Sequence, residues 1–198
     1  MQTGPEVSGT MKRLTIGVDI DGVIVDYAAV MLPVASEICG RPVTLQDLRS
    51  WDLMDALDIN EEQFKRLWEA TLGTDLLRYA PPIEGAIQGL SSLGKHEVWL
   101  VTARPASLQE VTLSWLAEHN ARYDHIIHDR YGDKVQAGRG FDVFVEDHLD
   151  EARNIAEAGV FSILMDQPWN QAPVLHPNCC RVFDWNSIIT LVNKLEQA

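Results

Sequence analysis

LTIGVDIDGV, at residues 14–23, is the stretch that decides how this chain folds. Residues 14–18 are mostly aliphatic or β-branched and predict a short buried strand. The strand delivers two carboxylates, Asp19 and Asp21, to its C-terminal end, where Gly22 frees the backbone to turn. In α/β folds, ligands bind at that end of the strands. Two acids so close repel each other and predict a compensating divalent cation; two solvated acids are the plainer alternative.

Polar side chains also follow three later apolar segments. Segment 97–101 leads to Thr102, segment 125–128 to a loop before Lys134, and segment 142–145 to Glu146 and Asp147. Because the carboxyl ends of parallel strands meet at one edge of a sheet, we expect these groups to lie beside Asp19 and Asp21. Carboxylates around a cation, with a hydroxyl and an ammonium nearby, predict a site for a phosphoryl group.

The order of the segments predicts an α/β fold. Strands alternate with helices after residue 11, which indicates a doubly wound parallel sheet covered on both faces. Helices are expected at 107–119, 150–158 and 187–197, and further strands at 160–165 and 181–184. Residues 27–80 interrupt the alternation, because they contain no convincing strand.

A helical insertion is expected in that interruption. Helices are predicted over 28–39, with a kink at Pro33, over a short segment from Thr44, and from a capping box at 60–63 to a stop at Gly73. The expected parts are a disordered lead-in at 1–11, a core of 12–26 and 81–198, and a helical cap at 27–80.

Composition limits the partners. The 198 residues are 46% hydrophobic and carry a formal net charge of −13, which argues against binding nucleic-acid polymers or anionic membranes. No apolar stretch approaches the roughly 20 residues that cross a bilayer. Three cysteines, two of them adjacent, do not suggest a disulfide framework. We expect a cytoplasmic protein, monomeric or homodimeric, that acts on a small molecule.

The order of the polar groups resembles the haloacid dehalogenase superfamily of phosphohydrolases. Its four motifs match the DxDGV sequence at 19–23, Thr102, Lys134 and the acidic pair Glu146-Asp147. Any one motif is weak, but the ordered set at strand ends is specific. The resemblance spans residues 19–150, and it implies a phosphatase with a Rossmann-type core and a cap after the first strand.

Finer features are similar to the 5′(3′)-deoxyribonucleotidase family. Residues 19–27 resemble its extended first motif, DxDGVxxD followed by an aromatic residue, and QPWN at 167–170 resembles its Q-P-[YW]-N segment. The chain departs from the pattern at Glu146, where Asp is usual, and at 148–149, where His-Leu replaces Arg-Pro. The sequence Ala-Arg-Pro at 103–105 also differs from that of vertebrate members. These departures concern nucleotide specificity.

The resemblance implies a role for each residue of the site. Asp19 is the nucleophile that forms an aspartyl-phosphate, already ionised at neutral pH, and Asp21 is the general acid and base, with its pKa raised by burial and acidic neighbours. Mg²⁺ is the implied cofactor, held by Asp19, the backbone carbonyl of Asp21, and Asp147. Thr102 and Lys134 contact the phosphoryl group.

Other residues are expected around these. Glu146 and Asp150 are predicted to orient the water shell of the metal. Ala103 and Arg104 are candidates for substrate contact, as is Arg130, although solvated arginines on loops are as good an interpretation. A base could stack on an aromatic ring of the cap, with Trp51 the better candidate, while Trp68 fits the core of its helix. Tyr79 is a third ring of the cap on which a base could stack, Trp169 could line the entrance, and His148 is at most a supporting residue.

Three alternatives remain open from the sequence. A sugar phosphate or another small phosphomonoester would require the same chemistry. A phospho-receiver module also uses acids, a hydroxyl and a lysine at strand ends, although a helical insertion of about fifty residues fits it poorly. A catalytically inactive binding protein is the third, and the retention of the four motif residues argues against it.

Overall fold

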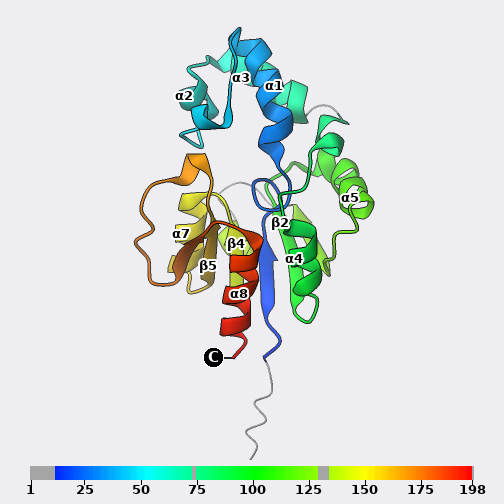
Figure 1. The fold of residues 1–198 in the computed structure, drawn as a ribbon, viewed down its shortest axis with the longest axis vertical. Helices are drawn as coiled ribbons and strands as arrows, with labels where there is room; N and C mark the ends of the chain where they lie inside the picture. Colours follow the sequence, from blue (N-terminus) through cyan, green and yellow to red (C-terminus); the bar gives the residue numbers. More distant parts are fainter. Residues whose placement is uncertain (1–11, 73–74, 129–133, 198) are drawn as a thin grey trace, which may run out of the picture.

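A six-stranded parallel sheet forms the centre of the protein (Figure 1). The computed structural model describes residues 12–72, 75–128 and 134–197. The strands are β1 (Thr15–Val18), β2 (Glu97–Thr102), β3 (His125–His128), β4 (Val143–Glu146), β5 (Phe161–Met165) and β6 (Cys179–Val182). Their order is β3-β2-β1-β4-β5-β6. The α/β class is as predicted, and β1 and β4, which carry the acidic motifs, are neighbours.

Helices cover both faces of this sheet. On one face, α4 (Ala86–Ser92), α5 (Gln109–Glu118) and α8 (Trp185–Leu195) pack on alternate strand residues such as Ile16 and Val98. On the other face, α6 (Lys134–Ala137) and α7 (Leu149–Glu157) cover residues of the opposite parity, such as Val101 and Phe144. This alternation follows from the period of two along a strand. The helices cover the two faces of the sheet and leave the carboxyl ends of its strands uncovered.

Two core elements differ from the sequence prediction. The last strand ends at Val182, two residues earlier than expected, because the Asp184 carboxylate accepts a hydrogen bond from the Ser187 amide and caps α8. Helix α4 was not predicted, and Gly89 lies in its interior. An added Cβ at Gly89 would lie 2.1 Å from the ring of Trp185, so close packing on α8 explains the glycine.

The insertion after β1, over residues 27–80, is helical throughout its described elements. It contains α1 (Tyr27–Cys39), η1 (Leu45–Asp47), α2 (Leu53–Leu57), α3 (Glu61–Leu72) and η2 (Asp75–Tyr79). The Asn60–Gln63 capping box is confirmed, because the amide of each residue donates to the side chain of the other. Helix α2 was not predicted. The expected stop at Gly73 and the lead-in before Lys12 lie outside the described residues.

This helical insertion has a hydrophobic cluster of its own, above the carboxyl edge of the sheet (Figure 1). Its fully buried members are Ala28, Met31, Ala35, Val43, Leu48, Leu57, Ile59 and Leu67. Two neighbouring chain segments join the insertion to the sheet: the Asp26 amide donates to the Pro81 carbonyl, and the Ile83 amide to Ile24. Within the described residues, no helix has the length and apolarity needed to cross a membrane.

Candidate active site

Asp19 directly follows the last residue of β1 and is still bonded to the neighbouring strand. Its amide donates to the Val145 carbonyl over 2.9 Å, so β4 holds the backbone of Asp19 in place. The chain then turns sharply: the amides of Ile24 and Val25 both donate to the Ile20 carbonyl. This turn directs the chain upward into α1 and leaves the Asp19 side chain buried at the sheet edge.

Gly22 allows that turn to touch the next acidic motif. Its φ of +77° lies in the left-handed region, which side chains disfavour. A Cβ at Gly22 would lie 2.0 Å from Asp147 Oδ2. The glycine is therefore required twice, by its backbone conformation and by the close approach of Asp147.

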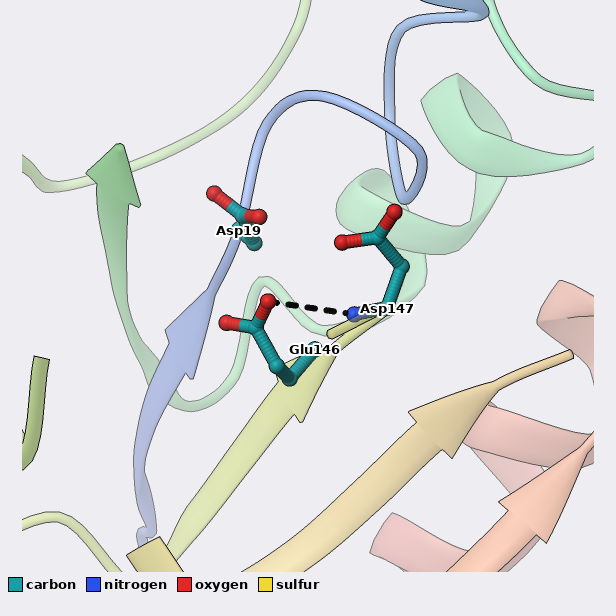
Figure 2. A group of neighbouring side chains, drawn as sticks. All are labelled: Asp19, Glu146 and Asp147. Carbon is teal, nitrogen blue, oxygen red and sulfur yellow. Dashed lines mark hydrogen bonds between the residues drawn. The ribbon is translucent and has the colours of Figure 1, made fainter. Parts of the chain in front are cut away.

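Three buried carboxylates converge at this edge, as Figure 2 shows. Asp19 comes from β1, and Glu146 and Asp147 come from the end of β4. One oxygen of each lies within 4.8 Å of the others. The order of strands predicted this convergence, because β1 and β4 are adjacent and parallel.

Lys134 neutralises part of this charge. Its ammonium lies 2.8 Å from Asp19 Oδ2 and 2.8 Å from Glu146 Oε2, with the lysine itself buried at the start of α6. Burial alone would lower the pKa of Lys134, but the two carboxylates raise it. The lysine is therefore a fixed positive charge next to Asp19.

Glu146 is held by hydrogen bonds at both of its carboxylate oxygens. Its Oε2 accepts from Lys134, and its Oε1 accepts from the amides of His148 (3.1 Å) and Asp147 (3.3 Å; Figure 2). Its contacts show that it anchors Lys134 and the start of α7. The role predicted for it, orienting metal-bound water, stays a prediction.

Asp19 and Asp147 fit a divalent cation. Asp147 Oδ1 is buried and, among the described residues, has no hydrogen-bond partner. Burial and the charge of Glu146 raise the pKa of Asp19 to about 8, in spite of Lys134, and burial and Glu146 raise the pKa of Asp147 well above its ordinary value. Burial of Asp19 therefore opposes the ionised form that the sequence analysis expects. A hard cation on the carboxylate oxygens would stabilise their ionised forms.

Asp21 faces a guanidinium. Arg104 Nε donates to Asp21 Oδ2 over 2.7 Å and Nη2 to Oδ1 over 2.6 Å, while Nη1 donates to Thr112. Arg104 is only 4% exposed, so its interpretation as a solvated loop residue was wrong. Sequence reasoning missed the pair, because 83 positions separate the two residues and no periodic pattern links them.

Thr102 and Ala103 lie beside this pair. Thr102 Oγ1 accepts from the Arg104 amide over 3.1 Å and so turns the chain inward after β2. The threonine is buried, its hydroxyl hydrogen remains available to a ligand, and both residues line the cavity described next.

A cavity of about 520 Å³ separates the acids from the helical insertion. Its upper wall is largely apolar and is formed by Met31, Leu45, Leu48, Trp51, Leu53, Phe64, Trp68, Leu72 and Trp169. Trp51 and Trp68 are 42% and 48% exposed. The preferred interpretation of Trp68 as helix core was wrong, because Leu67 and Thr71 occupy the buried face of α3. Tyr79 is 74% exposed and is not among the residues that line the cavity.

Three further candidates have different outcomes. The Asp150 side chain is 73% exposed on α7, pairs with Arg153 and does not line the cavity, so its position contradicts a role near the metal. His148 lines the cavity: its Nδ1 accepts from the Glu151 amide, and its ring meets the edge of Trp51 at 4.5 Å. Arg130 lies outside the described residues.

The segment after β5 also reaches the site. Gln167 Nε2 donates to the Gly22 carbonyl, Trp169 Nε1 to Asp147 Oδ2 (3.0 Å), and Asn170 Nδ2 to the Asp147 carbonyl (2.7 Å). The sequence signal was the QPWN segment itself. The sequence analysis placed Trp169 at the entrance of the site but predicted no contact for Gln167 or Asn170.

Comparison with known proteins identifies the class and the family. Over 91% of this chain, the fold matches a haloacid dehalogenase-like protein of Streptococcus pneumoniae (98% of that chain, TM-score 0.67, 13% identity). A magnesium-bound haloacid dehalogenase hydrolase of Bacillus subtilis matches over 92% of this chain (100% of that chain, TM-score 0.60, 15% identity). These likenesses define the fold as that of haloacid dehalogenase-like hydrolases.

Residues 13–197 match the family model described as "5' nucleotidase, deoxy (Pyrimidine), cytosolic type C protein", and the chain belongs to this family. A predicted nucleotidase of Halalkalibacterium halodurans is 34% identical over 178 residues, which are 88% of this chain and 90% of that protein. The protein is therefore a phosphoric monoester hydrolase of the nucleotidase type. Membership removes the phospho-receiver and the inactive binding protein from the alternatives.

Proposed function

We propose that the protein is a Mg²⁺-dependent 5′-nucleotidase that hydrolyses deoxyribonucleoside monophosphates through an aspartyl-phosphate on Asp19. The observation that carries the proposal is the position of Asp19, between Lys134 and Asp147 at the sheet end of a cavity with aromatic walls. The description of the family supports the nucleotide class.

Each side chain has a place in the reaction. An Asp19 oxygen attacks phosphorus, the bond to the ester oxygen breaks, and Asp21 gives its proton to that oxygen. Asp21 then takes a proton from the water that attacks the aspartyl-phosphate, which releases phosphate and restores Asp19. Lys134 and the Thr102 hydroxyl stabilise the negative charge of the phosphoryl oxygens.

Mg²⁺ would be held by Asp19, Asp147 and the backbone carbonyl of Asp21, and when bound it screens the phosphate charge from the attacking carboxylate. Support comes from Asp147 Oδ1, which has no hydrogen-bond partner among the residues that the structure describes, and from the raised pKa values of both aspartates. Arg104 is assigned to Asp21 rather than to phosphate, since its two hydrogen bonds hold that carboxylate in place. The ion pair stabilises the ionised form of Asp21, so Asp21 must take up a proton before it can act as the acid.

The helical insertion is proposed to act as the cap that receives the nucleoside. Its apolar wall offers ring faces and aliphatic side chains, which suit a planar base better than the hydroxyls of a sugar phosphate. A sugar phosphate remains the second candidate substrate. The groups at the sheet end of the cavity would contact only its phosphate, so the same reaction could act on it.

The test is phosphate release from deoxyribonucleotides, ribonucleotides and sugar phosphates, with Mg²⁺ and with EDTA. We expect metal-dependent turnover that favours deoxyribonucleotides. The Asp19→Asn variant, which keeps the shape of the side chain, should lose on the order of 10⁴-fold or more in kcat while its circular dichroism is unchanged. Undiminished activity of the folded variant would refute the nucleophile, and turnover confined to sugar phosphates would refute the substrate class.

A further inference from the structure

Trp169 connects two parts of the site that are distant in sequence. It lies in the turn η4 (Pro168–Asn170) after β5, and its indole N–H donates to Asp147 Oδ2 over 3.0 Å. Its ring packs against the hydrophobic cluster of the helical insertion. Its centroid is 6.3 Å from that of Trp51, with the two planes at 63°.

The indole N–H determines which Asp147 oxygen is free. Oδ2 lies between the indole on one side and Gly22 on the other, where even a Cβ would be 2.0 Å away. Oδ1 is the buried oxygen without a hydrogen bond in the described part of the chain. The carboxylate is therefore held in one rotation, with Oδ2 engaged by the protein and Oδ1 presented to a cation.

The backbone of the same aspartate is fixed by the next residue. Asn170, which is buried, donates from Nδ2 to the carbonyls of Asp147 and Met165, both over 2.7 Å. Since Asn170 holds the main chain and Trp169 the side chain, the two tasks can be separated by substitution of Trp169 alone.

We propose that Trp169 is a positioning residue for the cation site: its indole N–H holds Asp147 in the rotation that binds the metal, while its ring supports the wall of the cavity. This inference rests on the proposed Mg²⁺ dependence. Outer groups that bond to metal ligands typically change metal affinity by about 10–100-fold when they are removed. The indole N–H of Trp169 should therefore affect the affinity for Mg²⁺, and its ring should affect the binding of the nucleotide.

Trp169→Phe tests the N–H, because it keeps an aromatic ring and removes the donor. We expect calorimetric titration with Mg²⁺ alone to show binding about 10-fold weaker or more, and the Mg²⁺ concentration for half-maximal activity to rise in parallel. At saturating Mg²⁺, KM for the nucleotide should change less than about threefold. Trp169→Tyr, which has a ring and a hydroxyl donor, should recover part of the affinity.

Trp99→Phe is the matched control. Its indole also donates to a carboxylate, Glu97 Oε1 over 3.1 Å, in a part-buried contact within β2, and neither residue lines the cavity. It should leave Mg²⁺ affinity unchanged. Wild-type Mg²⁺ affinity in a folded Trp169→Phe variant would overturn the proposal, as would an equal loss in Trp99→Phe.

A second measurement needs no variant at position 169. In the nitrogen-15 spectrum of the wild-type protein, Mg²⁺ should shift the indole N–H signal of Trp169 more than those of the buried Trp115 and Trp185. The absence of such a shift, in a protein that binds Mg²⁺, would also overturn the proposal. A wild-type protein that neither binds Mg²⁺ nor needs it for turnover would instead refute the proposed function.

Discussion

The sheet edge and the helical insertion are built on different principles. At the edge, Asp19, Lys134, Glu146 and Asp147 are buried and joined by short polar contacts, so each side chain has one position. In the insertion, the cavity is lined by large apolar side chains, two of which, Trp51 and Trp68, are nearly half exposed.

This difference separates the two tasks of the enzyme. Phosphate chemistry needs charges at fixed distances, and burial makes those charges strong and their positions unique. Contact with a nucleoside depends on the area of apolar contact more than on the exact position of each side chain, so partly exposed aromatic rings are sufficient. Substitutions at the edge should therefore affect turnover strongly, and substitutions in the insertion should affect KM moderately.

Gly22→Ala should have the largest effect, because it disturbs the edge in two ways. The left-handed φ of +77° disfavours a side chain by about 1–2 kcal/mol, and the new Cβ would also overlap Asp147 Oδ2. We expect a loss of stability of about 3 kcal/mol or more and a fall in kcat/KM of about 100-fold, measured by urea unfolding and phosphate release.

Gly40→Ala is its control. Gly40 ends α1 with a φ of +64°, and a Cβ there would meet no atom within 4 Å. Only the backbone penalty of about 1–2 kcal/mol should appear, with normal activity. Equal effects of the two substitutions would mean that the contact with Asp147 is irrelevant.

The buried acids of the edge predict a pH dependence of stability. In the protein alone the pKa of Asp19 is about 8, above the value of about 4 in the unfolded chain. Between these values the native state holds a proton that the unfolded state lacks, so stability falls as the pH rises through this window. Asp147, whose pKa is also raised, adds a slope of the same sign.

The measurement is Tm between pH 7 and 8 in EDTA, with Mg²⁺ and with Asp19→Asn as comparisons. This window avoids the opposite slope at lower pH from His96 and His148, whose pKa values burial lowers. Each kcal/mol lost lowers Tm by about 2–4 °C in a protein of this size. Both comparisons should flatten the slope; a Tm in EDTA that rises with pH would contradict the prediction.

The edge was also the part that the sequence predicted best. Residue types and their order after each apolar segment were sufficient, because a parallel sheet brings the ends of its strands together whatever lies between them. What the sequence did not show was how the charged groups pair. Glu146 bonds to Lys134 and Arg104 to Asp21, and these choices depend on three-dimensional geometry.

The insertion was predicted only as a class of structure. Its helical character followed from capping signals. The position of Trp68 on the cavity wall did not follow, since helical spacing does not distinguish the face of α3 that packs on α1 from the face that lines a cavity. The short helix α2, five residues long, has too few positions for a periodic pattern.

Trp51→Ala should have a moderate effect, confined to KM. Loss of a stacking ring weakens binding by about 1–3 kcal/mol, which corresponds to roughly 5–150-fold in KM for a nucleotide, with kcat little changed. KM for a small aryl phosphate should rise less. Tyr79→Ala, in the insertion but outside the cavity, is the control and should change neither constant. Equal increases for both substrates would remove Trp51 from the base-binding wall.

Asp150→Asn should have the smallest effect. It tests whether a residue that is close to the acidic motif in sequence, but exposed in the fold, contributes to the site. Asp150 follows the acidic motif by only three residues, yet its 73% exposed side chain pairs with Arg153 on the outer surface of α7. An exposed pair of this kind contributes about 0.2–1 kcal/mol at most. We expect kcat, KM and Mg²⁺ affinity within about twofold of the wild type, because this carboxylate is exposed, pairs with Arg153 and does not line the cavity. A tenfold loss of Mg²⁺ affinity in a folded variant would show that an exposed residue of α7 contributes to the metal site. The site would then not be limited to the buried side chains.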